Sequence, residues 1–351
     1  MDKAAARARA TVVRVGRLLR QAEIVAYYLA VAPLLALLPA RLAYRAACSR
    51  GDWTFRHWPD KRSEVLDNLR QVLGRELSAA EAARVGRDIF RIRSCEIIDL
   101  MLLRGRARSL GKLVEIRGRE HLDAALAQGK GAILCSAHFG SYLCAFSLLH
   151  GDRSPVTSIG RWWWNYPPGE PSLERRIWDF VYARRVLRHR QRPNIEPWPG
   201  RMQVAVQAAA VLRANEVLTI SSDAPPLDSE RPRAIEVPFV GQQATFLPGV
   251  VSLAQLTGAP VLMAFAHRSA DYRHQVLEIS TPVPMEGATA TAFGRCAAAM
   301  AAAITANPAE WDFWFEPDDL ARLGLVPDSR RPAPQADDSA GQAGELQPAS
   351  R

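Results

Sequence analysis

GAILCSAHFGSYLCAFSLL, residues 131–149, decides the fold class of this 351-residue chain. Its first six residues are uncharged and apolar on both faces, which is typical of a strand buried inside a parallel sheet. A short loop that holds His138 follows, and Ser141–Leu149 predicts a helix. This order places His138 at the carboxyl edge of a sheet, where open α/β folds bind ligands.

The same alternation of strand and helix continues along the chain. Further apolar runs predict strands at 114–116, 217–221 and 260–266, and helices at 120–128, 204–212, 250–256 and 292–306. A last short strand is expected at Trp311–Phe315. We therefore expect an α/β fold, with a mixed, mostly parallel sheet that is flanked by helices.

Composition divides the chain into four regions. Residues 1–40 hold a basic N-terminus and an apolar helix, 41–112 are helical, 113–320 form the α/β core, and 321–351 form a tail. Ser78 and Glu81 have the spacing of a capping box, which predicts a helix start inside the second region. The tail is rich in Pro, Ala, Asp, Gln and Ser and has no aromatic residue, so we expect it to be disordered.

The apolar segment Ile24–Leu38 is uncharged but short. At 1.5 Å per residue it covers roughly 22 Å, which is less than the hydrocarbon core of about 30 Å. Pro33 interrupts it, and arginines flank both ends. We expect a helix that lies in the cytoplasmic leaflet and is held by apolar burial and arginine–lipid attraction. The alternative is a helix that packs against the core of the protein itself.

The net charge of +9 calls for an acidic partner, such as anionic lipid or an acidic carrier protein. Nucleic acid is not expected, because no nucleic-acid-binding motif is found. The five cysteines have no C-x-x-C spacing, which argues against a zinc site or a disulfide framework. From its apolar surroundings, Cys135 is expected to be a small buried residue rather than a nucleophile.

These patterns alone do not decide the role of His138. It could be a reactive base, or it could have a structural role at the end of a strand. Gly140 permits close approach of a ligand to the backbone. Amides at the start of the following helix could stabilise an oxyanion or a phosphate.

Several motifs, in order along the chain, carry a family resemblance. They are His138-Phe-Gly, Asp67-Asn-Leu-Arg70, Arg117-Gly-Arg-Glu-His-Leu122, Asp223, Val237-Pro-Phe-Val-Gly241, Ser252-Leu-Ala-Gln-Leu-Thr-Gly-Ala-Pro260 and Pro308-Ala-Glu-Trp311-Asp-Phe-Trp314. The set resembles the bacterial lipid A late acyltransferases and their lysophospholipid acyltransferase relatives, and it spans about residues 24–316. The first motif is similar to that family's H-F-G-N-W-E block.

The resemblance implies a glycerolipid acyltransferase-like fold and a monomeric, peripheral or monotopic enzyme on the cytoplasmic side of the inner membrane. Such an enzyme moves a fatty acyl group from acyl-carrier protein or acyl-CoA to a lipid, glycolipid or aminolipid acceptor. It needs no metal and no other cofactor. His138 would be the general base, because a hydroxyl is a poor nucleophile until a base takes its proton.

One position departs from the family's pattern. The acidic residue expected five positions after His138 is Leu143, and a leucine cannot orient an imidazole. Three explanations remain open. The acceptor could be a neutral amine that needs little help, or a carboxylate from Asp223, Glu96 or Asp99 could substitute. The third is a non-catalytic homologue that binds lipid or carrier protein. A hydrolase, with water as acceptor, is a further alternative.

The remaining candidates concern substrate binding. Phe139, Gly140 and Ser141 follow the histidine, and their backbone amides are expected to polarise the thioester. Arg161 and Asp223 are expected to contact the acceptor, with Arg161 beside the aromatic run Trp162–Trp164. The cluster Arg184, Arg185, Arg188 and Arg190 could dock an acidic carrier protein, or it could be a solvated face.

Overall fold

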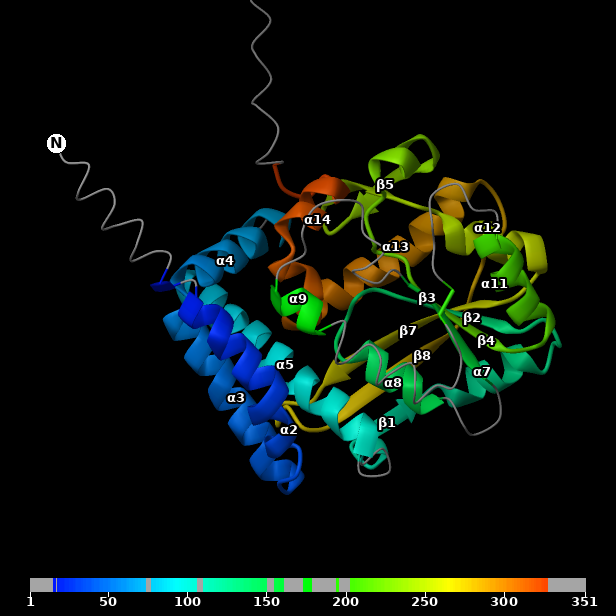
Figure 1. Ribbon diagram of the computed structural model, residues 1–351. Coiled ribbons are helices and arrows are strands. Elements are labelled where there is room, and N and C mark those ends of the chain that lie inside the picture. The colour runs from blue at the N-terminus through cyan, green and yellow to red at the C-terminus, as the bar shows by residue number, and fades with distance from the viewer. Residues whose placement is uncertain are drawn as a thin grey trace, which may run out of the picture.

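A computed structural model describes residues 15–16, 18–73, 77–105, 110–149, 155–160, 173–178, 194–195 and 203–327. The statements below refer to these residues. The fold is a six-stranded sheet with helices on both faces and a helical layer at one side (Figure 1). This arrangement confirms the predicted α/β class with an apolar N-terminal helix.

The large sheet has the strand order β1-β8-β7-β2-β4-β3. Its strands are β1 (Val114–Arg117), β2 (Ala132–Ser136), β3 (Val156–Ile159), β4 (Val217–Ser221), β7 (Val261–Arg268) and β8 (Gln275–Val283). All neighbouring pairs are parallel except β7 with β8. Strand β2 therefore lies in the middle of the sheet, as its uncharged sequence predicts.

Alternate residues of β2 enter two different cores. Ile133 and Cys135 pack with α12 (Gly249–Thr257) and α13 (Thr289–Ala306). Ala132 and Leu134 pack on the other face with α7 (Arg119–Leu126) and α8 (Tyr142–Leu149). A strand buried on both faces has no polar side to show, which explains the continuous apolar run. Helix α11 (Gln203–Arg213) contacts β4 and α12.

A hairpin of β5 (Ile235–Phe239) and β6 (Gln242–Phe246) lies outside the large sheet. Val240 and Gly241 join its strands, and both have positive φ, at 47° and 83°. A two-residue turn with positive φ at both positions suits the twist of a hairpin. Val240 is a β-branched residue in an unfavourable region, so the packing around the turn must compensate for the strain.

The helical layer consists of α3 (Ala40–His57), α4 (Pro59–Leu73) and the long α5 (Ala79–Gly105). The predicted capping box is confirmed, because the Ser78 hydroxyl accepts from the Glu81 amide and the Glu81 carboxylate accepts from the Ser78 amide, at 3.2 and 3.1 Å. Helices α3 and α5 pack side by side, and an apolar cluster joins them to the N-terminal helix.

The N-terminal helix does not break at Pro33. Helix continues from Leu18 to Leu35 and includes a π-helical turn, Tyr27–Val31, just before α2 (Ala32–Leu35). Proline clashes with the carbonyl four residues earlier in a regular helix, and a π turn changes that spacing locally. This helix, Leu18–Leu35, is long and apolar enough to cross a membrane, although those properties alone are weak support for a span.

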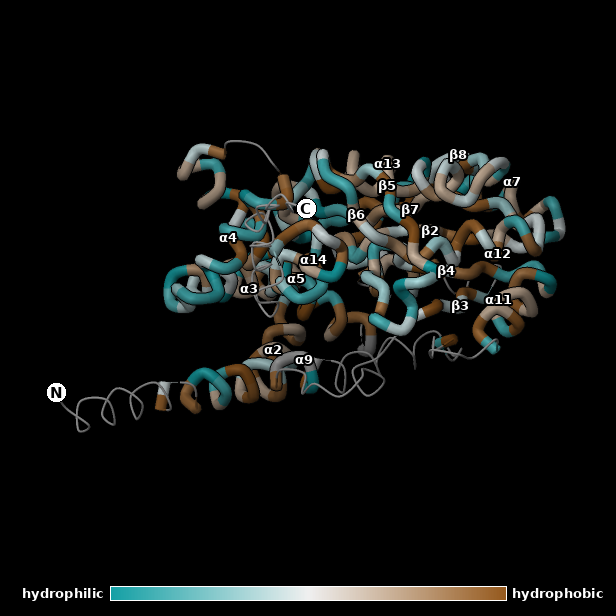
Figure 2. Tube along the Cα trace, turned by 90° about the horizontal axis from the view of Figure 1, so that it is seen from above, coloured by the Kyte–Doolittle hydropathy of each residue, from teal (hydrophilic) through white to brown (hydrophobic). Residues whose placement is uncertain are grey.

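Exposed apolar side chains concentrate at this end of the protein. Of the twelve large apolar side chains that are exposed in the described part of the chain, nine fall between residues 15 and 42. They are Val15, Leu18, Leu19, Leu29, Val31, Leu34, Leu37, Leu38 and Leu42. Figure 2 shows this helix as a largely brown segment at one edge of the molecule. Only 22% of the residues in its apolar window are buried, so packing against the protein core does not account for its sequence.

Two expectations differ from the structure at the C-terminal end. The segment Trp311–Phe315 is not a strand, because 312–315 form the 3₁₀ turn η6 (Asp312–Phe315), preceded by η5 (Pro308–Glu310). Only Trp311 makes a β-bridge, and its partner is Phe139. Helix α14 (Pro317–Leu323) follows. The tail was expected at 321–351, but 321–323 belong to α14, and residues 328–351 lie outside the described residues.

Candidate active site

His138 stands just after the carboxyl end of β2, as the sequence predicts. Its side chain is 26% exposed, in a loop of otherwise buried residues. The imidazole stacks on Phe313, with ring centres 4.9 Å apart, and meets Tyr142 edge-on at 5.4 Å. Two aromatic rings thus restrict the orientations that the imidazole can adopt.

Asp223 is the carboxylate partner of His138. Its Oδ1 lies 2.7 Å from His138 Nδ1, and its Oδ2 accepts a hydrogen bond from the His138 backbone amide at 2.8 Å. The aspartate is fully buried, two residues after the end of β4. Because β2 and β4 are parallel neighbours, their carboxyl ends meet at one edge of the sheet and bring these two residues together.

Trp311 completes this arrangement from the C-terminal part of the chain. Its indole N–H donates to Asp223 Oδ2 at 2.9 Å, and its side chain is buried. The carboxylate therefore accepts from two donors besides the imidazole, which fixes its plane. Sequence reasoning missed this role. The only signal was that the Trp311 segment belongs to the resemblance.

The loop that carries His138 is held by its backbone as well. The Asp312 amide donates to the His138 carbonyl at 2.9 Å, and the Gly140 amide donates to the Glu310 carbonyl at 2.7 Å. These bonds form a short antiparallel bridge around Phe139 and Trp311. The Gly140 amide is therefore bonded to Glu310 in this structure, and that amides around Gly140 polarise the thioester stays a prediction.

Gly140 has a different structural requirement. Its φ is +56°, and a Cβ atom there would lie 1.8 Å from the carbonyl oxygen of Ala266 in β7. Any side chain would push the loop away from the sheet. The glycine therefore allows close packing of two backbones, in place of the expected close approach to a ligand.

The other residues around His138 are buried. Phe139 packs edge-on against Phe265, and the Ser141 hydroxyl donates to Asp99 at 2.5 Å. That they contact the substrate stays a prediction, as it does for Gly140, and their contacts here support the loop. Asp223 was expected at the acceptor, but all its described contacts are with His138 and Trp311.

Leu143 has an apolar environment. It is half-buried against the cluster that joins the N-terminal helix, α3 and α5. Of the carboxylates considered as substitutes, Asp99 binds Tyr44, Ser141 and Arg268, and Glu96 lies 3.8 Å from Arg93. Asp223 is the one that contacts the imidazole.

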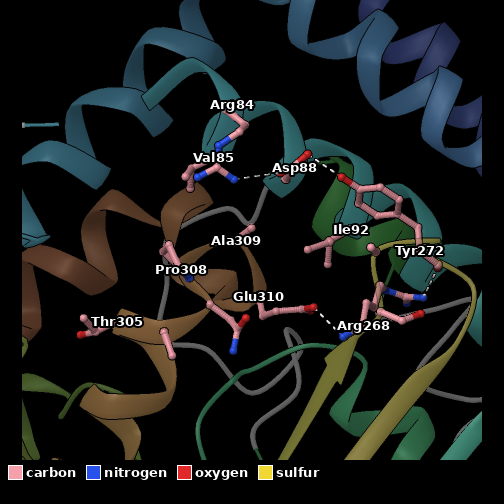
Figure 3. Close-up of a pocket in the computed structure, with 14 residues that line it drawn as sticks. Arg84, Val85, Asp88, Ile92, Arg268, Tyr272, Thr305, Pro308, Ala309 and Glu310 are labelled. Carbon is pink, nitrogen blue, oxygen red and sulfur yellow. Dashed lines mark hydrogen bonds and ion pairs between the residues drawn. The ribbon is translucent and has the colours of Figure 1, made fainter. Parts of the chain in front are cut away.

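A buried contact between Arg268 and Glu310 and a cavity lie beside this loop. The Arg268 amide donates to Glu310 Oε1 at 2.6 Å, as Figure 3 shows. Both residues line a cavity of 380 Å³, whose other walls come from α5, the β7–β8 turn and the end of α13. Burial raises the pKa of Glu310 to about 7, although the nearby Arg268 acts in the opposite direction.

Two further observations concern possible metal ligands and the cysteines. In the part of the chain that the structure describes, no three His, Cys, Asp or Glu side chains are grouped to hold a metal. Cys135 is fully buried beside Cys296 and Ser222, and the Cys296 contact and burial raise the pKa of its thiol well above the usual value. The prediction that it is not a nucleophile fits this environment. Arg161, Trp162–Trp164 and the arginine cluster at 184–190 lie outside the described residues.

A histidine paired with a buried aspartate at the carboxyl edge of an α/β sheet has the geometry of a general base with an orienting carboxylate. The comparison with family models makes this specific. Residues 16–318 match the model of the bacterial lipid A biosynthesis acyltransferases, and the chain belongs to that family. Among curated proteins, a sequence search finds no match.

Proposed function

We propose that the protein transfers a fatty acyl group from acyl-carrier protein or acyl-CoA to a lipid or glycolipid acceptor, with His138 as general base and Asp223 as its orienting carboxylate. Family membership supports acyl transfer in general. The observation that carries the finer proposal is the 2.7 Å contact between His138 Nδ1 and Asp223 Oδ1. In this proposal, Asp223 supplies the carboxylate that is missing at position 143.

The proposed reaction needs one proton acceptor. As the acceptor hydroxyl or amine attacks the thioester carbonyl, His138 Nε2 takes its proton, while the Nδ1–H bond to Asp223 stabilises the imidazolium. The tetrahedral intermediate then breaks its carbon–sulfur bond. The imidazolium returns the proton to the departing thiolate, so the histidine is unchanged after each turnover.

The exposed apolar helix supports a location at the cytoplasmic surface of an inner membrane. The exposed Leu34, Leu37, Leu38 and Leu42 are joined by Arg41 and Arg45, which are also exposed. An apolar strip beside guanidinium groups suits insertion among acyl chains with contact to anionic headgroups. An anchored enzyme would meet its lipid acceptor without extracting it far from the bilayer.

The test is an acyl transfer assay with radiolabelled lauroyl-carrier protein and lauroyl-CoA as donors. Acceptors are a tetra-acylated lipid A precursor, lysophosphatidylethanolamine, and extracted inner-membrane lipid. We expect a labelled lipid product with the wild type and a loss of at least about 10³-fold with His138→Ala.

Three results would contradict the proposal. Equal activity in the wild type and in His138→Ala would show that His138 is not the general base. Binding of acyl-carrier protein or lipid without transfer to any acceptor would favour the non-catalytic homologue. Release of free fatty acid in place of a lipid product would indicate a hydrolase.

A further inference from the structure

We infer that the buried ion pair Arg268–Asp99 positions His138 for the proposed reaction, acting through Ser141. The inference rests on the proposed function, because it concerns the geometry of that site. Arg268 ends β7, and Asp99 lies in the last third of α5. Their side chains contact each other and are almost completely excluded from solvent, at 1% and 0% exposure.

The guanidinium and the carboxylate both bind the hydroxyl of Ser141. Arg268 Nη2 donates to Ser141 Oγ at 2.5 Å, and Ser141 Oγ donates to Asp99 Oδ2 at 2.5 Å. Ser141 is the last loop residue before α8 and is only three residues from His138. The ion pair thus fixes one end of the catalytic loop.

The residue before Ser141 is linked to the backbone of Arg268, independently of its guanidinium. The Arg268 amide donates to Glu310 Oε1 at 2.6 Å, and the Glu310 carbonyl accepts from the Gly140 amide at 2.7 Å. Two consecutive loop residues, 140 and 141, are therefore held from β7. Trp311 and Asp312, next to Glu310, contact Asp223 and the His138 carbonyl.

Stability alone gives little reason for a charged pair at this place. Removing two ions from water is costly, and apolar side chains of similar volume are often equally stable or more so. Apolar side chains would not supply directed hydrogen bonds to a serine hydroxyl. The specific contribution of Arg268 and Asp99 is therefore the fixed position of the loop.

The pair also extends into the helical layer. The Tyr44 hydroxyl in α3 donates to the second oxygen of Asp99, so α3, α5, β7 and the loop meet at one carboxylate. An error of about 1 Å in the position of a catalytic group can reduce the rate about 100-fold. The expected result of losing the pair is an imidazole that separates from Asp223.

An NMR titration of His138 tests the inference without any acyl donor. Protein labelled at histidine ¹³Cε1 is titrated in detergent micelles, and the His138 signal is assigned by its absence in His138→Ala. The groups that face the ring are Asp223, Tyr142, Phe313 and the Trp311 segment. Asp223 is the one whose negative charge favours the imidazolium, so its separation lowers the pKa of His138.

The decisive variant is Asp99→Leu with Arg268→Met, which removes both charges and keeps the volume. The matched control is Asp52→Leu with Arg91→Met. This second ion pair joins α3 to α5, at 2.8 Å, and it does not touch the loop. We expect the pKa of His138 to fall by about one pH unit in the first double variant and to stay constant in the control.

An unchanged pKa of His138 in a folded Asp99→Leu/Arg268→Met protein would overturn the inference, and so would an equal fall in the control. If the first double variant does not fold, Ser141→Ala decides, because it removes only the hydroxyl. A lower pKa of His138 then supports the inference, and an unchanged one overturns it.

Activity gives a second readout. If the wild type transfers acyl groups, we expect kcat of the double variant to fall about 100-fold with KM changed less than about threefold. A wild type that transfers nothing would contradict the proposed function alone, because the titration still reports whether the pair positions the ring.

Discussion

In the proposed reaction, a single carboxylate takes the place of the usual acidic residue five positions after His138. Asp223 comes from a different strand and reaches Nδ1 at 2.7 Å, with its second oxygen bonded to the His138 amide and to Trp311. An aspartate in this position orients the ring and stabilises its charged form. The spacing along the sequence is therefore less important than the position of the carboxylate in space.

Asp223→Asn is expected to reduce kcat about 10³- to 10⁴-fold, because an amide can select the wrong tautomer of the imidazole. The measurement is the initial rate of acyl transfer at saturating donor. Asp228→Asn is the control, since that side chain is 96% exposed nearby in the chain. A fall of less than tenfold would assign the orienting role to another group.

Leu143→Glu is expected to give no increase in rate. Nδ1 of His138 already has a carboxylate partner, and residue 143 packs into an apolar cluster where an ionised side chain is unfavourable. The transfer rate and the melting temperature of the variant check this. A clear gain in rate would show that Asp223 does not supply what the missing carboxylate normally supplies.

Trp311→Phe is expected to lower kcat about fivefold, because it removes one hydrogen bond to Asp223 worth about 1 kcal/mol and leaves the ring volume largely filled. Trp53→Phe on the exposed side of α3 is the control. Comparable losses in the two variants would mean that the indole N–H has no specific effect on the site.

At the scale of elements, the N-terminal helix and the core have different surfaces. Residues 15–42 carry nine of the twelve exposed large apolar side chains in the described residues, and a π turn keeps the helix continuous past Pro33. The sequence predicted the apolar helix from composition. It did not predict the π turn, because that feature depends on how neighbouring carbonyls adjust to the proline ring.

Leu34→Glu with Leu37→Glu is expected to release the protein from vesicles of phosphatidylethanolamine and phosphatidylglycerol. Each substitution places a charge where an exposed leucine would enter the acyl chains. Co-flotation in a sucrose gradient measures the bound fraction. Val206→Glu with Leu256→Glu, at two equally exposed positions on α11 and α12, is the control. Equal binding of both variants would contradict the assigned membrane face.

For the molecule as a whole, stability is expected to decrease as the pH rises from about 5 to 8. Burial raises the pKa of Glu310 from 4.5 to about 7, so the folded protein keeps a proton that the unfolded chain loses. Stability falls wherever the folded state binds more protons. The stabilisation by the protonated Glu310 is fully present below the pKa that this group has in the unfolded chain. It is lost as the pH rises through 7, and the free energy of unfolding then decreases by about 3 kcal/mol in total.

Urea unfolding at pH 5.5 and pH 8 measures this difference. In Glu310→Gln the amide oxygen still accepts from the Arg268 amide, but no proton is exchanged, so the pH dependence should become smaller. The same slope with pH in both proteins would show that Glu310 does not titrate in this range.

The sequence predicted the class of fold and the place of His138 because both depend on local pattern. A strand that is apolar on both faces, followed by a loop and a helix, needs no distant contact to be recognised. The partnership of Asp223 with His138 depends on the pairing of β2 with β4, and Trp311 reaches the site from 173 positions further along the chain. Such contacts depend on which distant strands pair, and the apolar pattern of a single segment does not predict that pairing.

The bridge between Phe139 and Trp311 has a consequence for the synthesis of the protein. The ribosome produces His138 long before residues 310–312, which hold its loop and its carboxylate partner. Domains generally fold as units, so a growing chain that stops before residue 310 would lack this support for the histidine. In the proposed reaction, activity toward thioesters would then require synthesis past residue 312, and a chain interrupted earlier would leave acyl donors untouched.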